Sequence, residues 1–282
     1  FGYQRIHDLA GAAGDSQAKG LLIGATSGRT TLNGEGLQHQ DGHSHILSST
    51  IPNCLSYDPT FSHEVAVIIK DGIQKMYVDQ KNYFYYITTT NENYEHPPMP
   101  KGSEEGIVKG MYRLIESKTP AIRLLGSGSI LNESIKAKSI LDNYGIESEI
   151  WSVTSFNLLR KDGMEVERYN QLNPTKKEKQ TYVEECFKNQ SIPVIASTDY
   201  MRSYAEQIRP YIKDDFTVLG TDGFGRSDSR SSLREFFEID ANSIVRASAY
   251  TLFKNGTLDK KKLKEIYDDL EVDPLKPNPW EV

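Results

Sequence analysis

The sequence predicts an α/β protein in which short buried strands alternate with helices and most strands run parallel. Its apolar runs are short, rich in β-branched and aromatic residues, and end in turn residues. Segments with helix-compatible spacing separate many of these runs, and such alternation requires crossovers that favour parallel sheets covered on both faces. The 282 residues, 37 % hydrophobic and 26 % charged, suit two globular domains.

The first part of the chain predicts two helical segments and three strands. Residues 10–18 are small and helix-compatible, and the apolar run at 21–25 is typical of a buried strand. A second strand at 51–57 leads into a helix that starts at Asp58-Pro59, since proline favours the first helical turn, and ends near residue 76. The aromatic run at 83–89 predicts the third strand.

A polar, helix-breaking stretch at residues 116–120 predicts a boundary between domains at 1–117 and 118–282. Strands and helices alternate after this boundary. The expected strands are 121–125, 149–153, 192–196 and 216–220, and the expected helices are 132–144, 200–211, 232–238 and 241–254.

Composition excludes several classes of function. A net charge of −6 and a pI near 5.6 argue against nucleic acid as a partner. The apolar runs are too short for a bilayer-spanning helix, so no membrane span is expected. Only Cys54 and Cys186 are present, far apart in sequence, which favours a reducing, cytoplasmic location. Since the chain begins at Phe1 without Met or a signal sequence, we expect it to be part of a longer protein.

Two glycine-containing turns follow predicted strands. Gly126-Ser127-Gly128 resembles the start of a dinucleotide-binding fingerprint, but Leu131 occupies the place of the third glycine, so a close structural turn is favoured. The loop that begins at Gly220 and ends at Arg230 has backbone freedom and two arginines that could hold an anion. For this loop too, a structural or subunit-contact role is favoured over binding.

The most informative segment is a long polar loop at residues 26–49, here called the histidine loop. It contains His39, His43 and His45 together with two carboxylates, among them Asp41, and several glycines. Imidazoles titrate near neutral pH and suit hydrogen bonding or proton transfer to a reacting carbonyl. Zinc binding by the three histidines is an alternative, although glycines interrupt the spacing. The histidines could also satisfy only backbone groups of the loop.

Residues 26–45, TSGRTTLNGEGLQHQDGHSH, closely resemble the homodimeric pyruvate dehydrogenases, the thiamine-diphosphate-dependent decarboxylating components of bacterial complexes. Transketolases and 2-oxoglutarate dehydrogenases share this architecture but differ after the equivalent of Glu35-Gly36. Further matching segments cover almost the whole chain: 1–6, 90–94, 124–130, 152–156, 197–200 and 220–230.

This resemblance implies a fold and an activity. It implies the end of a pyrimidine-binding domain followed by a transketolase C-terminal-like domain. It further implies oxidative decarboxylation of pyruvate, with transfer of the acetyl group to a lipoyl domain of dihydrolipoyl acetyltransferase. Because active sites of the family lie between subunits, the resemblance also implies a homodimer.

Relative to the family pattern, the chain lacks the Gly-Asp-Gly motif and later Asn that bind the diphosphate and Mg²⁺. The nearest match, Thr221-Asp222-Gly223, lies in the wrong domain. The glutamate that activates the cofactor belongs upstream of Phe1. We therefore expect a C-terminal third that holds no metal ligands and is inactive alone.

Residue roles follow from the same resemblance. His39 is expected to be catalytic and to donate a hydrogen bond to an oxygen of the pyruvate-derived adduct. Phe1 is expected to bind the cofactor by packing on its pyrimidine ring, whereas His43 and His45 shape the loop. The alternatives are a zinc-dependent hydrolase built on His39, His43 and His45, or a non-catalytic interaction fragment. Because the family covers the histidine loop with parts missing here, we expect the loop to lack packing partners in this chain.

Overall fold

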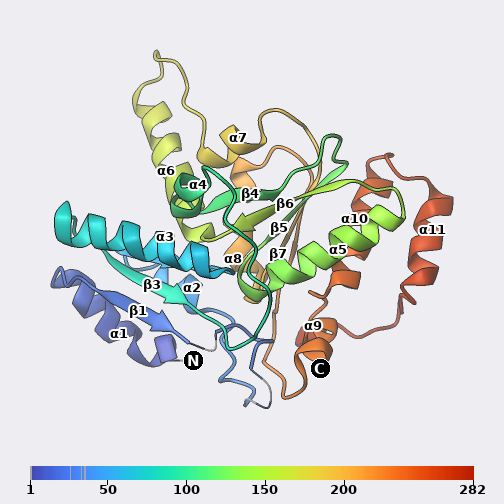
Figure 1. Cartoon of the computed structure of the whole chain (residues 1–282), viewed down its shortest axis with the longest axis horizontal. Helices are drawn as coiled ribbons and strands as arrows, with labels where there is room; N and C mark the ends of the chain where they lie inside the picture. Colours follow the sequence, from blue (N-terminus) through green and yellow to red (C-terminus); the bar gives the residue numbers. More distant parts are fainter. Residues whose placement is uncertain (1, 26, 33, 35) are drawn as a thin grey trace.

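The computed structural model describes residues 2–25, 27–32, 34 and 36–282, and its strands form two β-sheets (Figure 1). The first sheet has three parallel strands in the order β1 (Leu21–Gly24), β3 (Phe84–Thr88) and β2 (Cys54–Tyr57). The central strand β3 is the aromatic run of the sequence, and every residue in it is buried. Such residues fit a pleated surface that is covered on both faces.

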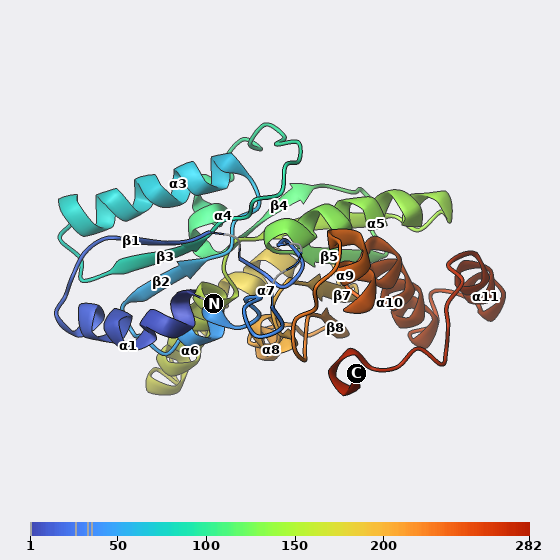
Figure 2. The same cartoon turned by 90° about the horizontal axis from the view of Figure 1, so that it is seen from below.

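Helices cover the two faces of the first sheet. Helix α1 (Gly2–Asp15) lies on one face and α3 (Ser62–Ile73), which continues into the π-helical turn η1 (Gln74–Val78), lies on the other (Figure 2). Successive residues of β3 point to opposite faces. Accordingly, the Tyr86 ring packs against Tyr3 of α1 with 4.4 Å between ring centroids, while Tyr85 belongs to the core beneath α3.

The second sheet confirms the predicted, mostly parallel α/β architecture. Only its edge strand β4 is antiparallel to its neighbour, β6. The strand order is β4 (Met111–Ile115), β6 (Ser148–Val153), β5 (Ile122–Gly126), β7 (Val194–Ser197) and β8 (Phe216–Leu219).

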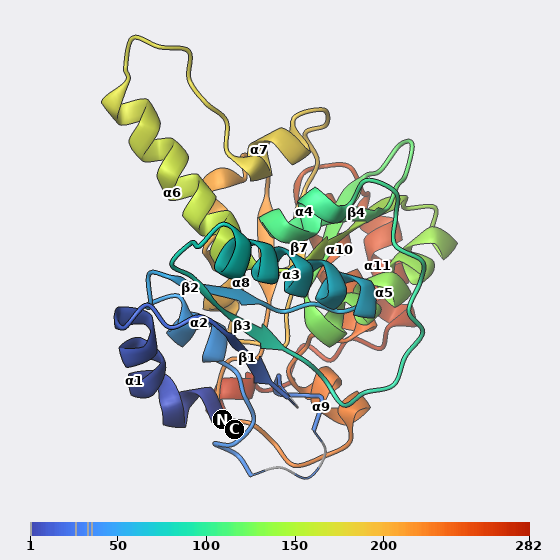
Figure 3. The same cartoon turned by 60° about the vertical axis from the view of Figure 1, so that its left-hand side comes forward.

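Two hydrophobic cores lie on opposite faces of this second sheet. One core contains residues of α5 (Leu131–Asn143), α9 (Arg230–Phe236), α10 (Ala241–Lys254) and α11 (Lys260–Asp269). The other contains residues of α6 (Phe156–Leu172), α7 (Tyr182–Phe187) and α8 (Arg202–Glu206). Helix α6 and the loop after it project from the rest of the molecule (Figures 1 and 3). The remaining elements are α2 (Ser44–Ser48), α4 (Glu104–Lys109), η2 (Gly128–Ile130), η3 (Arg209–Tyr211) and η4 (Pro279–Glu281).

Three predicted helices differ from the structure. The helical segment expected at 10–18 is α1, which begins earlier, at Gly2, and ends at Asp15. The helix expected from Asp58-Pro59 begins only at Ser62, because the Glu64 carboxylate accepts hydrogen bonds from the backbone N–H groups of Thr60 and Phe61 and thereby closes the helix there. The helix expected at 200–211 is divided into α8 and η3, since Pro210 lacks the N–H that a continuous helix needs.

The two sheets meet where β2 and β5 end. The backbone N–H of Asp58 donates to the carbonyl of Thr154 at 2.7 Å, and the N–H of Gly128 donates to the Asp58 carbonyl at 3.1 Å. Strand β4 precedes residue 117 yet pairs within the second sheet. The division at 117 and 118 stays a prediction. No helix in the described part of the chain is long and apolar enough to cross a membrane.

Candidate active site at the ends of the first sheet

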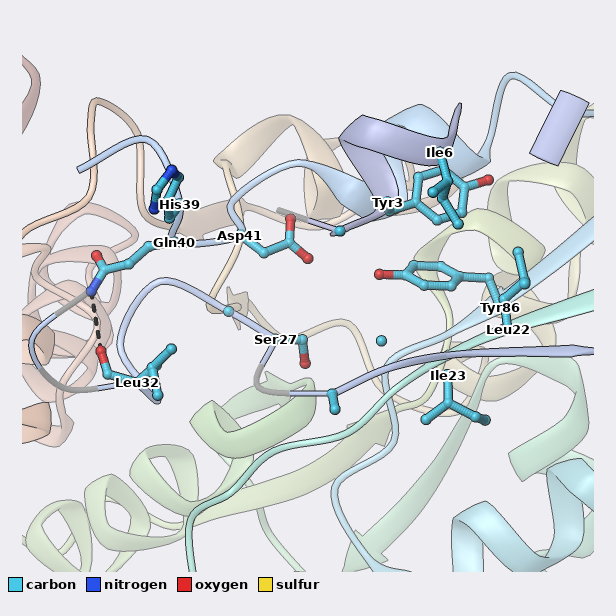
Figure 4. Close-up of a pocket in the computed structure, with 14 residues that line it drawn as sticks. Tyr3, Ile6, Leu22, Ile23, Ser27, Leu32, His39, Gln40, Asp41 and Tyr86 are labelled. Atoms are coloured by element: carbon cyan, nitrogen blue, oxygen red, sulfur yellow. Dashed lines mark hydrogen bonds between the residues drawn. The ribbon is translucent and has the colours of Figure 1, made fainter. Parts of the chain in front are cut away.

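A cavity of about 340 Å³ lies beside the carboxyl ends of the first sheet, where α/β proteins commonly bind ligands. The first turn of α1, strand β1, Tyr86 of β3 and the histidine loop surround it (Figure 4). Ile6 and Leu22 provide apolar lining, whereas His39, Asp41 and Tyr86 provide polar groups. An apolar wall with a few convergent polar groups is typical of a small-molecule site.

Asp41 is fixed in this cavity by the helix that follows it. Its carboxylate accepts hydrogen bonds from the backbone N–H of Ser44 at 2.9 Å, from the N–H of His43 at 3.2 Å and from the Ser44 hydroxyl. The Tyr86 hydroxyl points toward this carboxylate across the cavity (Figure 4). Burial, reinforced by the nearby Asp41, raises the pKa of Tyr86 well above its ordinary value, so the phenol stays a hydrogen-bond donor at neutral pH.

The structure places His39 at the cavity, half-buried and next to Gln40 and Asp41. Its backbone N–H donates to the Gly36 carbonyl at 2.9 Å, which closes a backbone turn that ends at His39. The predicted catalytic role of His39 stays a prediction. Phe1, the predicted cofactor-binding residue, lies outside the described residues, but Gly2 and Tyr3 next to it line the same cavity.

His45 lies elsewhere, fully buried between Tyr200 and Tyr204. Burial lowers its pKa to about 4, so the ring is neutral at pH 7. The Thr88 hydroxyl is 3.0 Å from His45 Nε2 and donates to Asp58 Oδ1 at 2.7 Å. Because that hydroxyl has a single proton, Nε2 of His45 is the donor of the other hydrogen bond. His45 therefore ties the histidine loop to β3 and does not face the cavity.

His43 lines a second cavity of about 450 Å³, together with Arg29, Phe224 and Trp280. The three imidazoles of the loop consequently lie in three different environments. Within the described ranges, no group of three or more His, Cys, Asp or Glu side chains has a geometry that could hold a metal ion. The structure therefore gives no support to the alternative of a zinc site built on His39, His43 and His45.

The expectation that the histidine loop lacks packing partners is wrong for much of its described part. Thr30 and Thr31 are completely buried. The backbone N–H and the hydroxyl of Thr30 donate to the Asp199 carboxylate at 3.2 and 2.9 Å, and the N–H of Met201 donates to the Gly42 carbonyl at 2.9 Å. Residues that follow β7 thus supply packing that we expected only from absent parts of the protein.

The turn at Gly126-Ser127-Gly128 has the structural role that the sequence favours. Gly128 has φ of +52°, and a Cβ there would lie 2.7 Å from Asp58 Oδ2. A Cβ on Gly126 would lie 2.6 Å from the Cα of Leu131. Both glycines therefore permit close contact between chain segments.

Sequence reasoning missed Tyr86 as a cavity residue, since inside an aromatic strand only the alternation of faces distinguishes it from Tyr85.

The sequence of this chain is similar to those of known families and proteins. Residues 1–97 match the family model of the pyruvate dehydrogenase E1 component middle domain, and residues 110–240 match that of the transketolase-like C-terminal domain. Pyruvate dehydrogenase E1 components of Pseudomonas aeruginosa and Escherichia coli K12 are similar to this chain, with sequence identities of 57 % and 54 %. Each alignment covers 99 % of this chain and 32 % of the relative's length.

Solved transketolase structures share the fold at low sequence identity. A mutant transketolase of Pichia stipitis superimposes with a TM-score of 0.65 and 16 % identity over 89 % of this chain and 32 % of its own. The transketolase of Campylobacter jejuni gives a TM-score of 0.65 and 18 % identity over 86 % of this chain and 33 % of its own. With high identity to the E1 components along nearly its whole length, the chain belongs to the pyruvate dehydrogenase E1 family.

Proposed function

We propose that the protein to which this chain belongs catalyses the oxidative decarboxylation of pyruvate and the reductive acetylation of lipoyl groups. The observation that carries the proposal is the position of His39 at a cavity beyond the carboxyl ends of parallel strands. Support also comes from relatives of known name, pyruvate dehydrogenase E1 components with 57 % and 54 % identity. The chain spans about a third of their length, so the complete reaction needs the remainder.

The cavity fits one end of thiamine diphosphate. Ile6, Leu22 and the Tyr86 ring offer contacts suited to a heterocycle, and Asp41 and the Tyr86 hydroxyl offer polar partners. Ligands for the diphosphate and its Mg²⁺ would come from the remainder of the protein, because the described residues form no group suited to a metal ion. When bound, the cofactor supplies the electron sink for decarboxylation.

The residues of this chain orient the substrate and manage protons. In the proposal, the His39 imidazole donates a hydrogen bond to an oxygen of the reacting substrate, where a fixed donor stabilises developing charge. Phe1 packs on the pyrimidine ring of the cofactor. Its neighbours Gly2, Tyr3 and Ile6 line the cavity, which supports this placement of the start of α1.

The proposal includes a homodimer, a lipoyl domain of dihydrolipoyl acetyltransferase as acceptor, and a cytoplasmic location. Ile6, Leu9 and Ile23 expose 37 %, 67 % and 52 % of their surface along α1 and the edge strand β1. Exposed apolar groups of this kind favour coverage by another part of the protein or by a second subunit. The thiols of Cys54 and Cys186 are free, which supports a reducing compartment.

Substitution of His39 in the full-length enzyme tests the proposal. We expect His39→Ala to lower kcat and kcat/KM for pyruvate together by about 100-fold, since its partner is the transition state. The Kd of thiamine diphosphate, from calorimetric titration with Mg²⁺, should change less than about threefold. His43→Ala serves as the matched control because His43 lines the other cavity, and its kcat should stay near that of the parent. An unchanged kcat in His39→Ala would remove His39 from catalysis.

A further inference from the structure

The loop formed by residues 220–230, which follows β8, contacts the segment that carries His39. The backbone N–H of Gly225 donates to the Leu37 carbonyl at 2.9 Å. The side chain of Gln40 then bonds the same loop twice, since its Oε1 accepts from the N–H of Arg226 at 2.8 Å and its Nε2 donates to the Arg226 carbonyl at 2.7 Å. These three hydrogen bonds attach the chain to the loop on both sides of His39, at Leu37 and at Gln40.

We propose that Gln40 and Gly225 are positioning residues that hold the His39 turn in its catalytic orientation. This proposal rests on the proposed function of His39. Gln40 and Arg226 are 186 positions apart in sequence. Their hydrogen bonds join the histidine loop, which follows β1 of the first sheet, to the loop that follows β8 of the second sheet. The remaining acceptor of the Gln40 amide, the Leu32 carbonyl at 3.3 Å, lies within the histidine loop itself (Figure 4).

The packing around Gln40 makes this link rigid. Gln40 is only 2 % exposed, so the C=O and NH2 groups of its side-chain amide are withdrawn from water. Removal of a hydrogen-bond partner therefore costs more free energy here than it would at an exposed amide. Gly225 permits the approach of the two loops, because a Cβ there would lie 2.7 Å from the Leu37 carbonyl oxygen and 2.4 Å from Gln40 Oε1. Its role is close contact, and no larger residue fits without moving a backbone.

His39 depends on this link because both bonded residues are close to it in sequence: Leu37 lies two residues before His39, and Gln40 follows it directly. Its own turn is closed by the hydrogen bond from its N–H to the Gly36 carbonyl, one residue before Leu37. Loss of the Gln40 bonds therefore removes the fixed point that lies one residue after His39. A misplacement of a catalytic group by about 1 Å is enough to slow a reaction considerably.

A double-mutant cycle in the full-length enzyme tests the proposal. We expect Gln40→Ala to lower kcat about tenfold, with the KM for pyruvate and the Kd of thiamine diphosphate within about twofold of the parent. If Gln40 acts through His39, then His39→Ala combined with Gln40→Ala should be no slower than His39→Ala alone. Additive losses of kcat would overturn the positioning role.

Two further variants sharpen the test. Gln40→Glu keeps the acceptor for the Arg226 N–H but places a buried carboxylate oxygen against the Arg226 and Leu32 carbonyls, so we expect its kcat to be at least as low as that of Gln40→Ala. Gln38→Ala is the matched control, since Gln38 is an exposed neighbour of His39 outside the link, and its kcat should equal that of the parent. Equal kcat values for Gln40→Ala and the parent would overturn the inference.

The proposed function fails separately from this inference. If His39→Ala retains full kcat, then the function assigned to His39 is wrong. If His39→Ala is slow while Gln40→Ala and Gly225→Ala are folded and fully active, then only the positioning role is wrong. A change in the melting temperature of a Gln40 variant without loss of kcat would likewise show that the link is structural.

Discussion

Three buried ionisable side chains, His45, Asp58 and Asp199, lie near the junction of the two sheets. Burial raises the pKa of each carboxyl to about 7 and lowers the pKa of His45 to about 4. For Asp58, hydrogen bonding by Thr88 and Ser127 opposes this rise only partly, and Oδ2 has no hydrogen-bond partner within the described part of the chain. Near pH 6 these groups favour their neutral forms, which limits the cost of burying them.

The raised pKa of Asp58 predicts a pH-dependent stability. Between its ordinary value of 3.8 and about 7, the folded chain retains a proton that the unfolded chain has released. The contribution of Asp58 is therefore complete at low pH and is lost as the pH rises through about 7. Asp58→Asn keeps the acceptor for Thr88 and removes the ionisation, so its free energy of unfolding should rise relative to the parent between pH 5 and 8.

Urea unfolding of both proteins at pH 5, 6, 7 and 8 measures this difference, which can grow by at most about 1.4 kcal/mol for each pH unit. Glu105→Gln is a surface control, because a hydrogen bond from Lys109 lowers the pKa of that exposed carboxyl below its ordinary value of 4.5. Glu105 is therefore ionised in the folded and unfolded chains above that value, and its variant should differ from the parent by a nearly constant amount between pH 6 and 8. A difference between Asp58→Asn and the parent that is constant with pH would show that Asp58 ionises as easily in the folded chain as in the unfolded one.

At the scale of elements, the sequence predicted the strands well and the connecting helices less well. Strands such as β3 and β5 are buried on both faces, so their sequences are mostly apolar runs. Such a run can be recognised as a strand from the sequence alone, without knowledge of the strands that pair with it. Strand β4 was missed because Arg113 is exposed in it and only its pairing with β6 makes it a strand. The sequence did not predict helices α6 and α11, because they are polar along much of their length and are stabilised by the packing of one narrow apolar face.

The candidate site was predictable to the extent that it is carried by one segment. The histidine loop contains His39 and Asp41, so the sequence indicated both. Tyr86 and the Gln40 link to Arg226 depend on segments far apart in the chain, and only the folded structure brings them together. The zinc alternative found no support because the fold places His39 at one cavity, His43 at another and His45 in the buried core.

Packing of α6 gives a prediction at this scale. A Cβ on Gly163 of α6 would lie 2.1 Å from the buried ring of Tyr211, whereas a Cβ on Gly11 of α1 would meet no atom within 4 Å. Gly163→Ala should therefore lower the free energy of unfolding by about 1–3 kcal/mol through overpacking. Gly11→Ala is the matched helical control and should raise it by up to about 1 kcal/mol. Equal urea midpoints for the two variants would mean that the Tyr211 ring moves aside at no cost.

At the scale of the whole molecule, contacts between the two sheets are polar, buried and spread along the chain. The Arg230 guanidinium donates to the Thr31 carbonyl at 2.7 Å, and Arg234 pairs with Glu92 and donates to the Thr30 hydroxyl at 3.3 Å. Further links join Asp58 to the segment after β6. Because these contacts satisfy groups that would otherwise be buried without partners, separation of the sheets would expose several unsatisfied groups at once.

We therefore predict that this chain unfolds as one cooperative unit, although its sequence divides into two matched domains. In native-state hydrogen exchange with added urea, the slowest amides of β3 and of β7 should open with the same free energy and the same urea dependence, since both require global unfolding. Amides of the histidine loop that bond to the second sheet, such as the N–H of Arg29 to the Asp199 carbonyl, should share the protection of these strands. Arg234→Met removes the pairs with Glu92 and Glu133 and should lower both opening energies together. Opening of β3 at a lower free energy than β7 in the parent chain would show that the polar contacts between the sheets are too weak to couple them.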